Sequence, residues 1–259
     1  MELYTRIMTF TFRSFLAYPL EVVAYVLKYF TKVIFLIAFW NVTLGSTNLF
    51  TQKELIAYFL LATSISDITM ADSGNLGRTL RRSIRSGGIN QILIKPMNAI
   101  FYMYSETLGQ IGTKIILAIL SLLVALTINP PTTPLSALLF IFFLINSFCI
   151  SFAYNLFEGS LALNITEVNG IKNAMHHISR LLSGQIVPLT FFSEHLRNLL
   201  LVTPVPYLAF VPISILTIKT IDSNTLAQIL IAIFWSITLN LLVLSYWRTS
   251  LKKYDAAGN

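Results

Sequence analysis

The sequence has few charged residues and little polar surface. Asp, Glu, Lys and Arg make up 11% of its 259 residues, whereas soluble domains carry about 25%. Hydrophobic residues account for 55% of the chain, and the mean hydropathy is +0.72. A soluble chain of this length cannot bury so much apolar surface, so the composition predicts a polytopic, all-α membrane protein. No polar interval is long enough to form a core of its own, which predicts one transmembrane domain over residues 1–259.

Catalytic and metal-binding signatures are also missing. Cys149 is the only cysteine, which excludes an intrachain disulfide and argues against cysteine-based metal chemistry. The sequence contains no G-x-x-x-x-G-K-[ST] phosphate-binding loop, no H-E-x-x-H zinc motif and no G-x-S-x-G nucleophile elbow. The adjacent His176 and His177 would point about 100° apart on a helix and would need further ligands to hold a metal. We expect no catalytic residue, no metal site and no cofactor in this chain.

The net charge of +7 is distributed beside the apolar segments. This arrangement follows the positive-inside rule and favours contact with membrane lipid or a cytoplasmic protein, not with nucleic acid. With both termini in the cytoplasm, the inner segments carry most of the 18 lysines and arginines, and the outer segments carry Lys53, Arg197 and Lys219. We therefore predict a multi-pass protein of the cell (inner or plasma) membrane with both termini cytoplasmic.

Apolar segments separated by polar turns predict six membrane-spanning helices. An amphipathic helix over residues 2–16, with Arg6 and Arg13 opposite its apolar face, is expected to lie along the cytoplasmic interface. The predicted spans are residues 20–44, 54–71, 106–128, 135–157, 170–188 and 226–246.

The segment between the fifth and sixth predicted spans, residues 189–223, has a different character. Its apolar pieces are too short to cross a bilayer, and prolines interrupt them, which is typical of re-entrant or interfacial helices. Just before it, Gly184 and Pro188 allow the fifth helix to bend and end.

Charged residues inside the predicted spans leave two interpretations open. Lys28 and Lys32 share one stripe of the first span, and either they extend to the cytoplasmic surface or they form a polar wall of a water-filled cavity. Polar residues recur every four positions from Tyr102, and they either line a pathway or pack as a seam against another helix. The candidate residues for a pathway or seam are Lys28, Lys32, Asp67, Glu106, Gln110 and Lys114.

The longest polar interval between strongly apolar segments is residues 72–96, after the second predicted span. At about 100° per residue, four arginines fall on one side of a helix and three aliphatic residues fall on the other. Gly87 and Gly88 are expected to end this helix. A short two-faced helix between two spans either lies on a lipid surface or docks a partner. Its residues are Leu76, Arg78, Leu80, Arg81, Arg82, Ile84 and Arg85, with Asp72 as the one nearby acid.

Four segments, taken in their order and spacing, resemble the type 2 ABC exporter permeases. These are the six-span transmembrane subunits of ATP-driven transporters, and the similarity is greatest to permeases without large external domains. The segments are Ile84-Arg85-Ser86-Gly87 leading to Leu93-Ile94-Lys95-Pro96, Leu181-Leu182-Ser183-Gly184 followed by Ile186-Val187-Pro188-Leu189, Pro204-Val205-Pro206-Tyr207 leading to Val211-Pro212, and the Trp235 span with its basic tail Arg248 to Gly258.

This resemblance implies that the chain pairs with a second permease, identical or related, and with two P-loop ATPase subunits that bind ATP and Mg. Residues 72–96 would contain the coupling helix that docks on the ATPase, and the pair would export its substrate by alternating access. The spans are rich in Phe, Leu and Ile, which suits an amphiphilic or hydrophobic substrate. Without the resemblance, a secondary transporter, a scaffold or an intramembrane enzyme acting on lipid would also fit the composition. The implied outer gate contains Ser183, Gly184, Pro188, Pro204, Pro206 and Pro212.

Overall fold

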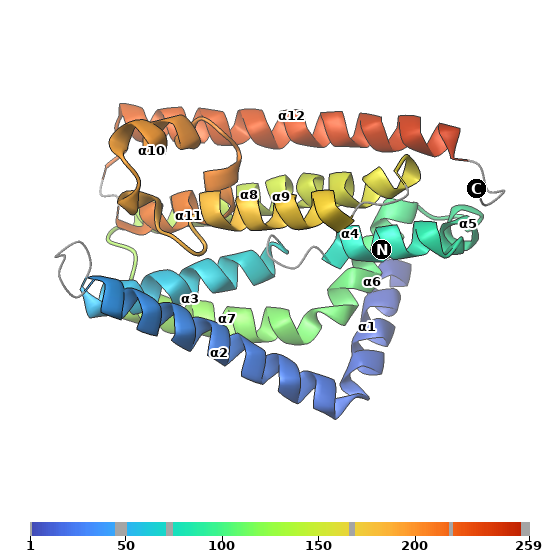
Figure 1. Ribbon diagram of the computed structural model, residues 1–259, viewed down its shortest axis with the longest axis horizontal. Coiled ribbons are helices and arrows are strands. Elements are labelled where there is room, and N and C mark those ends of the chain that lie inside the picture. The colour runs from blue at the N-terminus through green and yellow to red at the C-terminus, as the bar shows by residue number, and fades with distance from the viewer. Residues whose placement is uncertain (1, 45–50, 71–74, 166–168, 218–219, 255–259) are drawn as a thin grey trace.

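The computed structural model describes residues 2–44, 51–70, 75–165, 169–217 and 220–254, and these ranges contain α-helices, short 3-10 helices and turns but no strand. The long helices lie side by side, and α1 crosses them at one end (Figure 1). The long helices are α2 (Pro19–Leu44), α3 (Gln52–Ile68), α7 (Gly112–Ile128), α8 (Pro134–Ser160) and α12 (Ser223–Lys253). The shorter elements are α1 (Glu2–Leu16), α4 (Asn75–Arg85), α5 (Gly88–Leu93), α6 (Ala99–Gln110), α9 (Asn169–Leu182), α10 (Glu194–Leu201), α11 (Phe210–Ser214) and the 3-10 helices η1 (Leu161–Leu163), η2 (Leu189–Phe191), η3 (Val205–Leu208) and η4 (Ile215–Thr217).

Three helical stretches of the described chain are long and apolar enough to cross a bilayer. They are Pro19–Val42, Pro134–Leu163 and Ser223–Lys253, and α6 with α7 forms a fourth candidate if this bent pair is one span. The structure is therefore that of a multi-pass, all-helical membrane protein. At the second and fifth predicted spans, α3 has 17 residues and α9 has 14, fewer than the about 20 that a bilayer needs. Six spans therefore remain a prediction.

The segment predicted as one span from residue 106 is two helices. α6 and α7 meet at a 66° bend after Gln110. Gly109 and Gly112 flank this bend, and a Cβ on Gly109 would lie 2.5 Å from the carbonyl oxygen of Met8. The helix α1 therefore packs directly against the bend, because the two glycines leave room for its backbone and for the Phe12 ring. The bend separates Lys114 from the polar residues of α6, so the sequence period of four does not form one continuous face.

The proline-containing segment after α9 consists of short helices, as its sequence predicts, and they pack against α8 and α12. Side chains satisfy carbonyl groups that these short helices leave without backbone partners. The Trp235 indole donates a hydrogen bond to Val202 O at 2.8 Å, and the Ser147 hydroxyl donates one to Leu208 O at 2.9 Å. Protein thus covers η3, α11 and η4, whereas most of α10 is exposed, and the predicted re-entrant position of the segment in a membrane stays a prediction.

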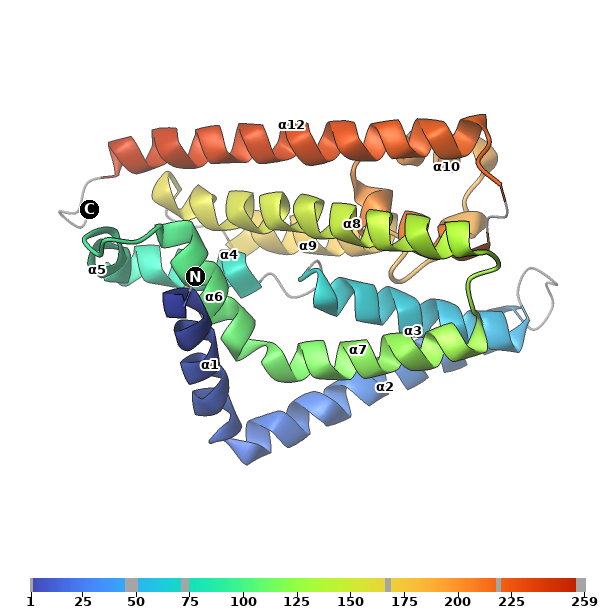
Figure 2. The same ribbon diagram turned by 180° about the vertical axis from the view of Figure 1, so that it is seen from behind.

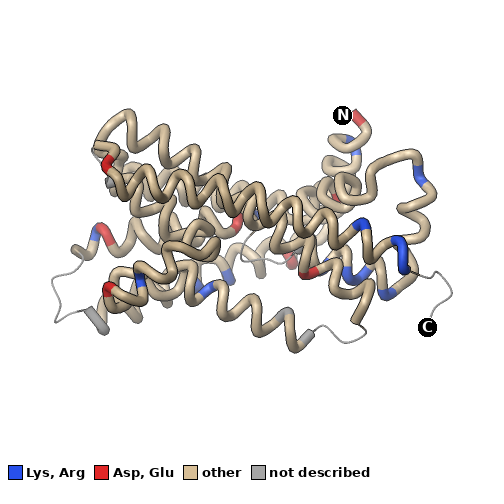
Figure 3. The backbone as a smooth tube through the Cα atoms, turned by 90° about the horizontal axis from the view of Figure 1, so that it is seen from above, with Lys and Arg blue, Asp and Glu red and all other residues tan. Residues whose placement is uncertain are grey.

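Both termini lie at the end of the molecule that carries α4 and α5, and α10 lies at the opposite end (Figures 1 and 2). Most lysines and arginines gather at the end with the termini (Figure 3). Asp72, Lys219 and residues 255–258 of the basic tail lie outside the described residues.

Candidate functional site

The short polar helix predicted after the second span is α4. It ends at Arg85, and Gly87 has a φ of 71°, a left-handed conformation that costs a glycine little and stops the helix. The predicted helix and its glycine end are therefore confirmed. α5 follows at once from Gly88.

The apolar face of α4 packs on the end of α8. Leu76 and Leu80 are each 1% exposed, and Ile84 is also buried. Two glycines allow the close approach, one on each helix. A Cβ on Gly77 would lie 2.8 Å from the backbone oxygen of Asn155, and a Cβ on Gly159 would lie 2.6 Å from Leu80 Cδ2. Protein therefore covers this face of α4, which excludes it as a lipid-facing surface.

Arg81 is the exception among the four arginines of α4. The sequence pattern groups it with the others on an exposed side, but it is buried, and its Nη1 lies 3.0 Å from Oε1 of Glu158 on α8. The reason is geometric, because Arg81 lies about 60° from Ile84 around the helix and so borders the buried face. Glu158 is only 2% exposed, and the two charges form a buried ion pair between the helices.

The other three arginines of α4 are exposed on one side of the helix, Arg78 near its start and Arg82 and Arg85 nearer its end. Arg78 lines a cavity between helices, described below, whereas Arg82 and Arg85 belong to the outer surface of α4. Lys95, beyond α5, lies 4.6 Å above the ring of Tyr102. The exposed positive surface of this region is thus carried by Arg82 and Arg85 without Arg81.

A cavity of about 370 Å³ lies between α2, α3, α4, α7 and α9, and we call it the cationic cavity. α2 and α9 are on the same side of the molecule, in front in Figure 1 and behind in Figure 2. Five cationic side chains and one carboxylate contribute to its wall, together with a histidine and two tyrosines. Its residues are Lys28, Lys32, Arg78, Lys114, Arg180, Asp67, His176, Tyr25 and Tyr29.

The cationic cavity contains four of the six residues predicted for a polar pathway or seam. Lys28 and Lys32 lie in its wall, and Lys28 is exposed, so a polar cavity wall and lysines that extend to the surface both stay predictions. Glu106 and Gln110 are on α6, before the bend, and they do not line it. Sequence reasoning missed Arg78, His176 and Arg180 as members, because they come from segments far apart in the chain.

Tyr25 connects two groups of opposite charge within the cationic cavity. Its hydroxyl donates a hydrogen bond to Oδ2 of Asp67 at 3.3 Å, and Nζ of Lys114 lies 4.7 Å above its ring. These contacts hold α2 against α3 and α7 on one side of the cavity. Lys28 and Lys32 lie one and two turns further along α2, and Arg180 approaches from α9.

A second hollow of about 500 Å³ shares three residues with the cationic cavity, and we call it the adjoining groove. Lys28, Lys32 and Arg180 belong to both. The rest of its wall is mainly apolar and consists of Thr31, Phe35, Leu36 and Ile186. The charged and apolar spaces therefore meet along one line of cationic side chains.

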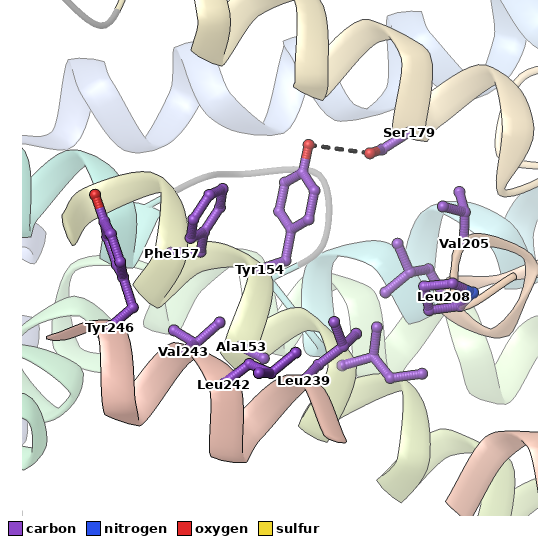
Figure 4. A pocket seen from close by; sticks show the side chains of 12 residues that line it. Ala153, Tyr154, Phe157, Ser179, Val205, Leu208, Leu239, Leu242, Val243 and Tyr246 are labelled. Atoms are coloured by element: carbon purple, nitrogen blue, oxygen red, sulfur yellow. Dashed lines mark hydrogen bonds between the residues drawn. The ribbon is translucent and has the colours of Figure 1, made fainter. Parts of the chain in front are cut away.

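A third cavity, of about 380 Å³, is lined almost entirely by apolar side chains from α8, α12 and η3 (Figure 4). The Tyr154 hydroxyl accepts a hydrogen bond from the Ser179 hydroxyl at 3.0 Å, and the Tyr246 hydroxyl accepts one from Nδ2 of Asn164 at 2.9 Å. The wall presents no charged group, so it has little to orient a polar ligand.

The residues of the implied outer gate fall into two places. Ser183 and Gly184 form the turn after α9, where the Tyr58 hydroxyl donates to Gly184 O at 2.7 Å and the Phe210 amide donates to Ser183 O at 2.9 Å. Gly184 has a φ of 86°, as expected of a helix that ends here. The four prolines follow this turn in the sequence. Pro188, Pro206 and Pro212 are buried, and Pro204 lines the apolar cavity.

Within the described ranges, no three His, Cys, Asp or Glu side chains come together as a metal site would require. One family model matches the chain over residues 22–258, and its description is "ABC-2 family transporter protein". No curated protein and no solved structure matches the chain. The matched range includes α4, the cationic cavity and the adjoining groove.

Proposed function

The chain belongs to the ABC-2 family of transporter proteins, and from this we propose that it is the transmembrane permease subunit of an ATP-driven exporter. Its cargo is amphiphilic or hydrophobic and leaves the cytoplasm or the inner leaflet by alternating access. The chain contains no phosphate-binding loop, so ATP and Mg bind to partner ATPase subunits that supply the free energy. Two such ATPases act on a pair of permeases, identical or related.

The observation that carries this proposal is the attachment of α4 to α8. A buried apolar face, two close glycine contacts and the ion pair between Arg81 and Glu158 fix a short helix to the end of a long one. The opposite side of α4 presents Arg82 and Arg85. A partner that binds this exposed side and moves would displace α8 with α4, because packed helices move as units. We therefore assign α4 as the coupling helix, on the cytoplasmic side.

In this scheme the ATPases work by conformational bias. They favour one of two permease arrangements only to the extent that they bind α4 differently in each. The outer gate is assigned to the turn at Ser183 and Gly184 and to the short helices that follow Pro188, because this segment is built from short pieces packed on α8 and α12.

Affinity purification from mild detergent tests the proposal. The expected result is a stoichiometric P-loop ATPase together with the chain. If repeated preparations contain no ATPase at that level, the proposed function is wrong.

Charge reversal tests the assigned docking face. Arg82→Glu should abolish the stimulation of ATP hydrolysis by the permease without loss of membrane insertion, since Arg82 lies on the exposed side of α4. Lys53→Glu is the matched control, because Lys53 is exposed at the start of α3, on the predicted outer side. Equal stimulation in the two variants would contradict the docking face.

A further inference from the structure

We propose that the cationic cavity binds the anionic headgroup of an amphiphile whose apolar chain occupies the adjoining groove. The phosphate or carboxylate of a lipid-like molecule has the required chemistry. Its assignment as the transported cargo rests on the proposed permease function, whereas binding itself does not.

The charge of the cavity selects an anion. Its wall contains five lysine and arginine side chains and, among the described residues, one carboxylate, that of Asp67. Cations in membrane-spanning segments are costly and mark binding sites or pathways more often than lipid-facing surface. Lysine and arginine donate several hydrogen bonds each, and arginine binds a phosphate or carboxylate through two parallel bonds. Together these side chains form a receptor for a headgroup with one or two negative charges.

The adjoining groove would bind the apolar chain of the ligand. Lys28, Lys32 and Arg180 stand at the boundary, and Phe35, Leu36 and Ile186 continue the wall with apolar surface. A free inorganic anion would use only the charged space, and an uncharged hydrophobic molecule would use only the apolar one. A molecule with a charged end and an apolar chain uses both, which is why we favour an anionic amphiphile.

The cavity also touches α4, through Arg78. A headgroup held there lies against the helix assigned to ATPase docking, and it also contacts α2 and α9. Binding of the ligand can therefore favour one position of α4, provided that its contacts differ between the two permease arrangements. This gives cargo a direct route to influence the ATPase.

Binding to the purified full chain in neutral detergent tests the headgroup assignment. The probes are dioctanoyl phosphatidic acid, dioctanoyl phosphatidylcholine and inorganic phosphate, with Kd measured by microscale thermophoresis. We expect phosphatidic acid to bind about tenfold or more tightly than either other probe, because only it has both a net negative headgroup and an apolar chain. Equal binding of phosphatidylcholine would overturn the anion assignment, and equal binding of inorganic phosphate would overturn the amphiphile.

Variants locate the site. Lys28→Gln/Lys32→Gln should weaken binding of phosphatidic acid by about tenfold or more, and Lys53→Gln, outside the cavity, should leave it unchanged. Lys28 is exposed on α2, so the single Lys28→Gln variant keeps the fold and should still weaken binding several-fold if the double variant fails to fold. Unchanged affinity in the single variant would show adsorption elsewhere and overturn the proposed site.

The cargo assignment is tested with the ATPase complex reconstituted in phosphatidylcholine vesicles. Added phosphatidic acid should raise ATP hydrolysis with the unmodified chain and not with Lys28→Gln/Lys32→Gln. If phosphatidic acid binds but hydrolysis does not respond, the cargo assignment is wrong. If no ATPase associates with the chain, the proposed function fails, and the binding measurement still decides the headgroup site.

Discussion

The ion pair between Arg81 and Glu158 provides the strongest test of how α4 is held. Arg81→Met removes one charge and leaves the Glu158 carboxylate buried beside Gly77. A Cβ added at Gly77 would lie 3.1 Å from the carboxyl carbon of Glu158. Arg81→Met/Glu158→Met removes both charges and keeps side chains of similar length. Comparison of the two variants separates the cost of removing one charge of the pair from the cost of lost packing.

The separation of 3.0 Å sets the scale of the effect. With an effective dielectric constant of about 20, the attraction at this distance is roughly 5 kcal/mol, most of which desolvation of the two groups cancels. Loss of one partner of a buried pair costs about 3–5 kcal/mol, because the other charge stays buried. Replacement of both by apolar residues is often close to neutral, so the double variant should recover most of the loss.

Two measurements check this prediction. The free energy of unfolding in mixed detergent micelles should fall by about 3–5 kcal/mol in Arg81→Met and by roughly 1 kcal/mol or less in the double variant. Hydrogen exchange should become faster over α4 in the single variant, while the middle of α12 serves as an internal reference. If the single variant matches the unmodified chain in both stability and exchange, the pair does not hold α4, and our account of the attachment is wrong.

Three further substitutions test packing elsewhere. Gly77→Ala should destabilise the chain by about 1–3 kcal/mol, because the added Cβ would enter the contact with α8. Gly170→Ala is the control and should cost nothing measurable, since open space surrounds that position. Equal free energies of unfolding for the two variants would refute the close contact. Gly184→Ala should cost at least about 1–2 kcal/mol, since its φ of 86° is unfavourable for alanine, and an unchanged stability would contradict that turn. Trp40→Phe should lower the free energy of unfolding by about 1–3 kcal/mol, because the Ile186 carbonyl loses the indole N–H that donates to it at 2.9 Å. Thermal unfolding of the variant and the unmodified chain measures this loss, and equal stabilities would contradict the hydrogen bond.

The local features of α4 could be predicted from sequence because they depend on neighbouring residues. The helical spacing of Leu76, Leu80 and Ile84 and the glycines at 87 and 88 determine which face is apolar and where the helix ends. The fate of Arg81 could not be predicted in the same way, because its partner is 77 positions away in the sequence. A position at the edge of an apolar face becomes buried or exposed according to what the neighbouring helix offers.

The bend between α6 and α7 shows the same limit in another form. Gly109 and Gly112 are weak helix formers, but the surrounding sequence holds no proline and does not by itself predict a 66° change of direction. The two glycines at the bend leave room for α1, which packs against them and comes from a different part of the chain. For the same reason, the sequence of α2 alone could not show that Lys28 and Lys32 lie beside Arg180, which comes from α9.

If the proposed function holds, three regions of α4 would link cargo to ATP hydrolysis. Its buried face is fixed to α8, its Arg78 reaches the cationic cavity, and its outer side carries Arg82 and Arg85. If a ligand in the cavity and an ATPase on the outer side both favour one position of the same short helix, each must strengthen the binding of the other by the same factor. An anionic amphiphile that binds the cavity should therefore tighten the association of the ATPase with the chain even when no nucleotide is hydrolysed. Such reciprocity follows from the position of α4 between the two sites and requires no longer path through the protein.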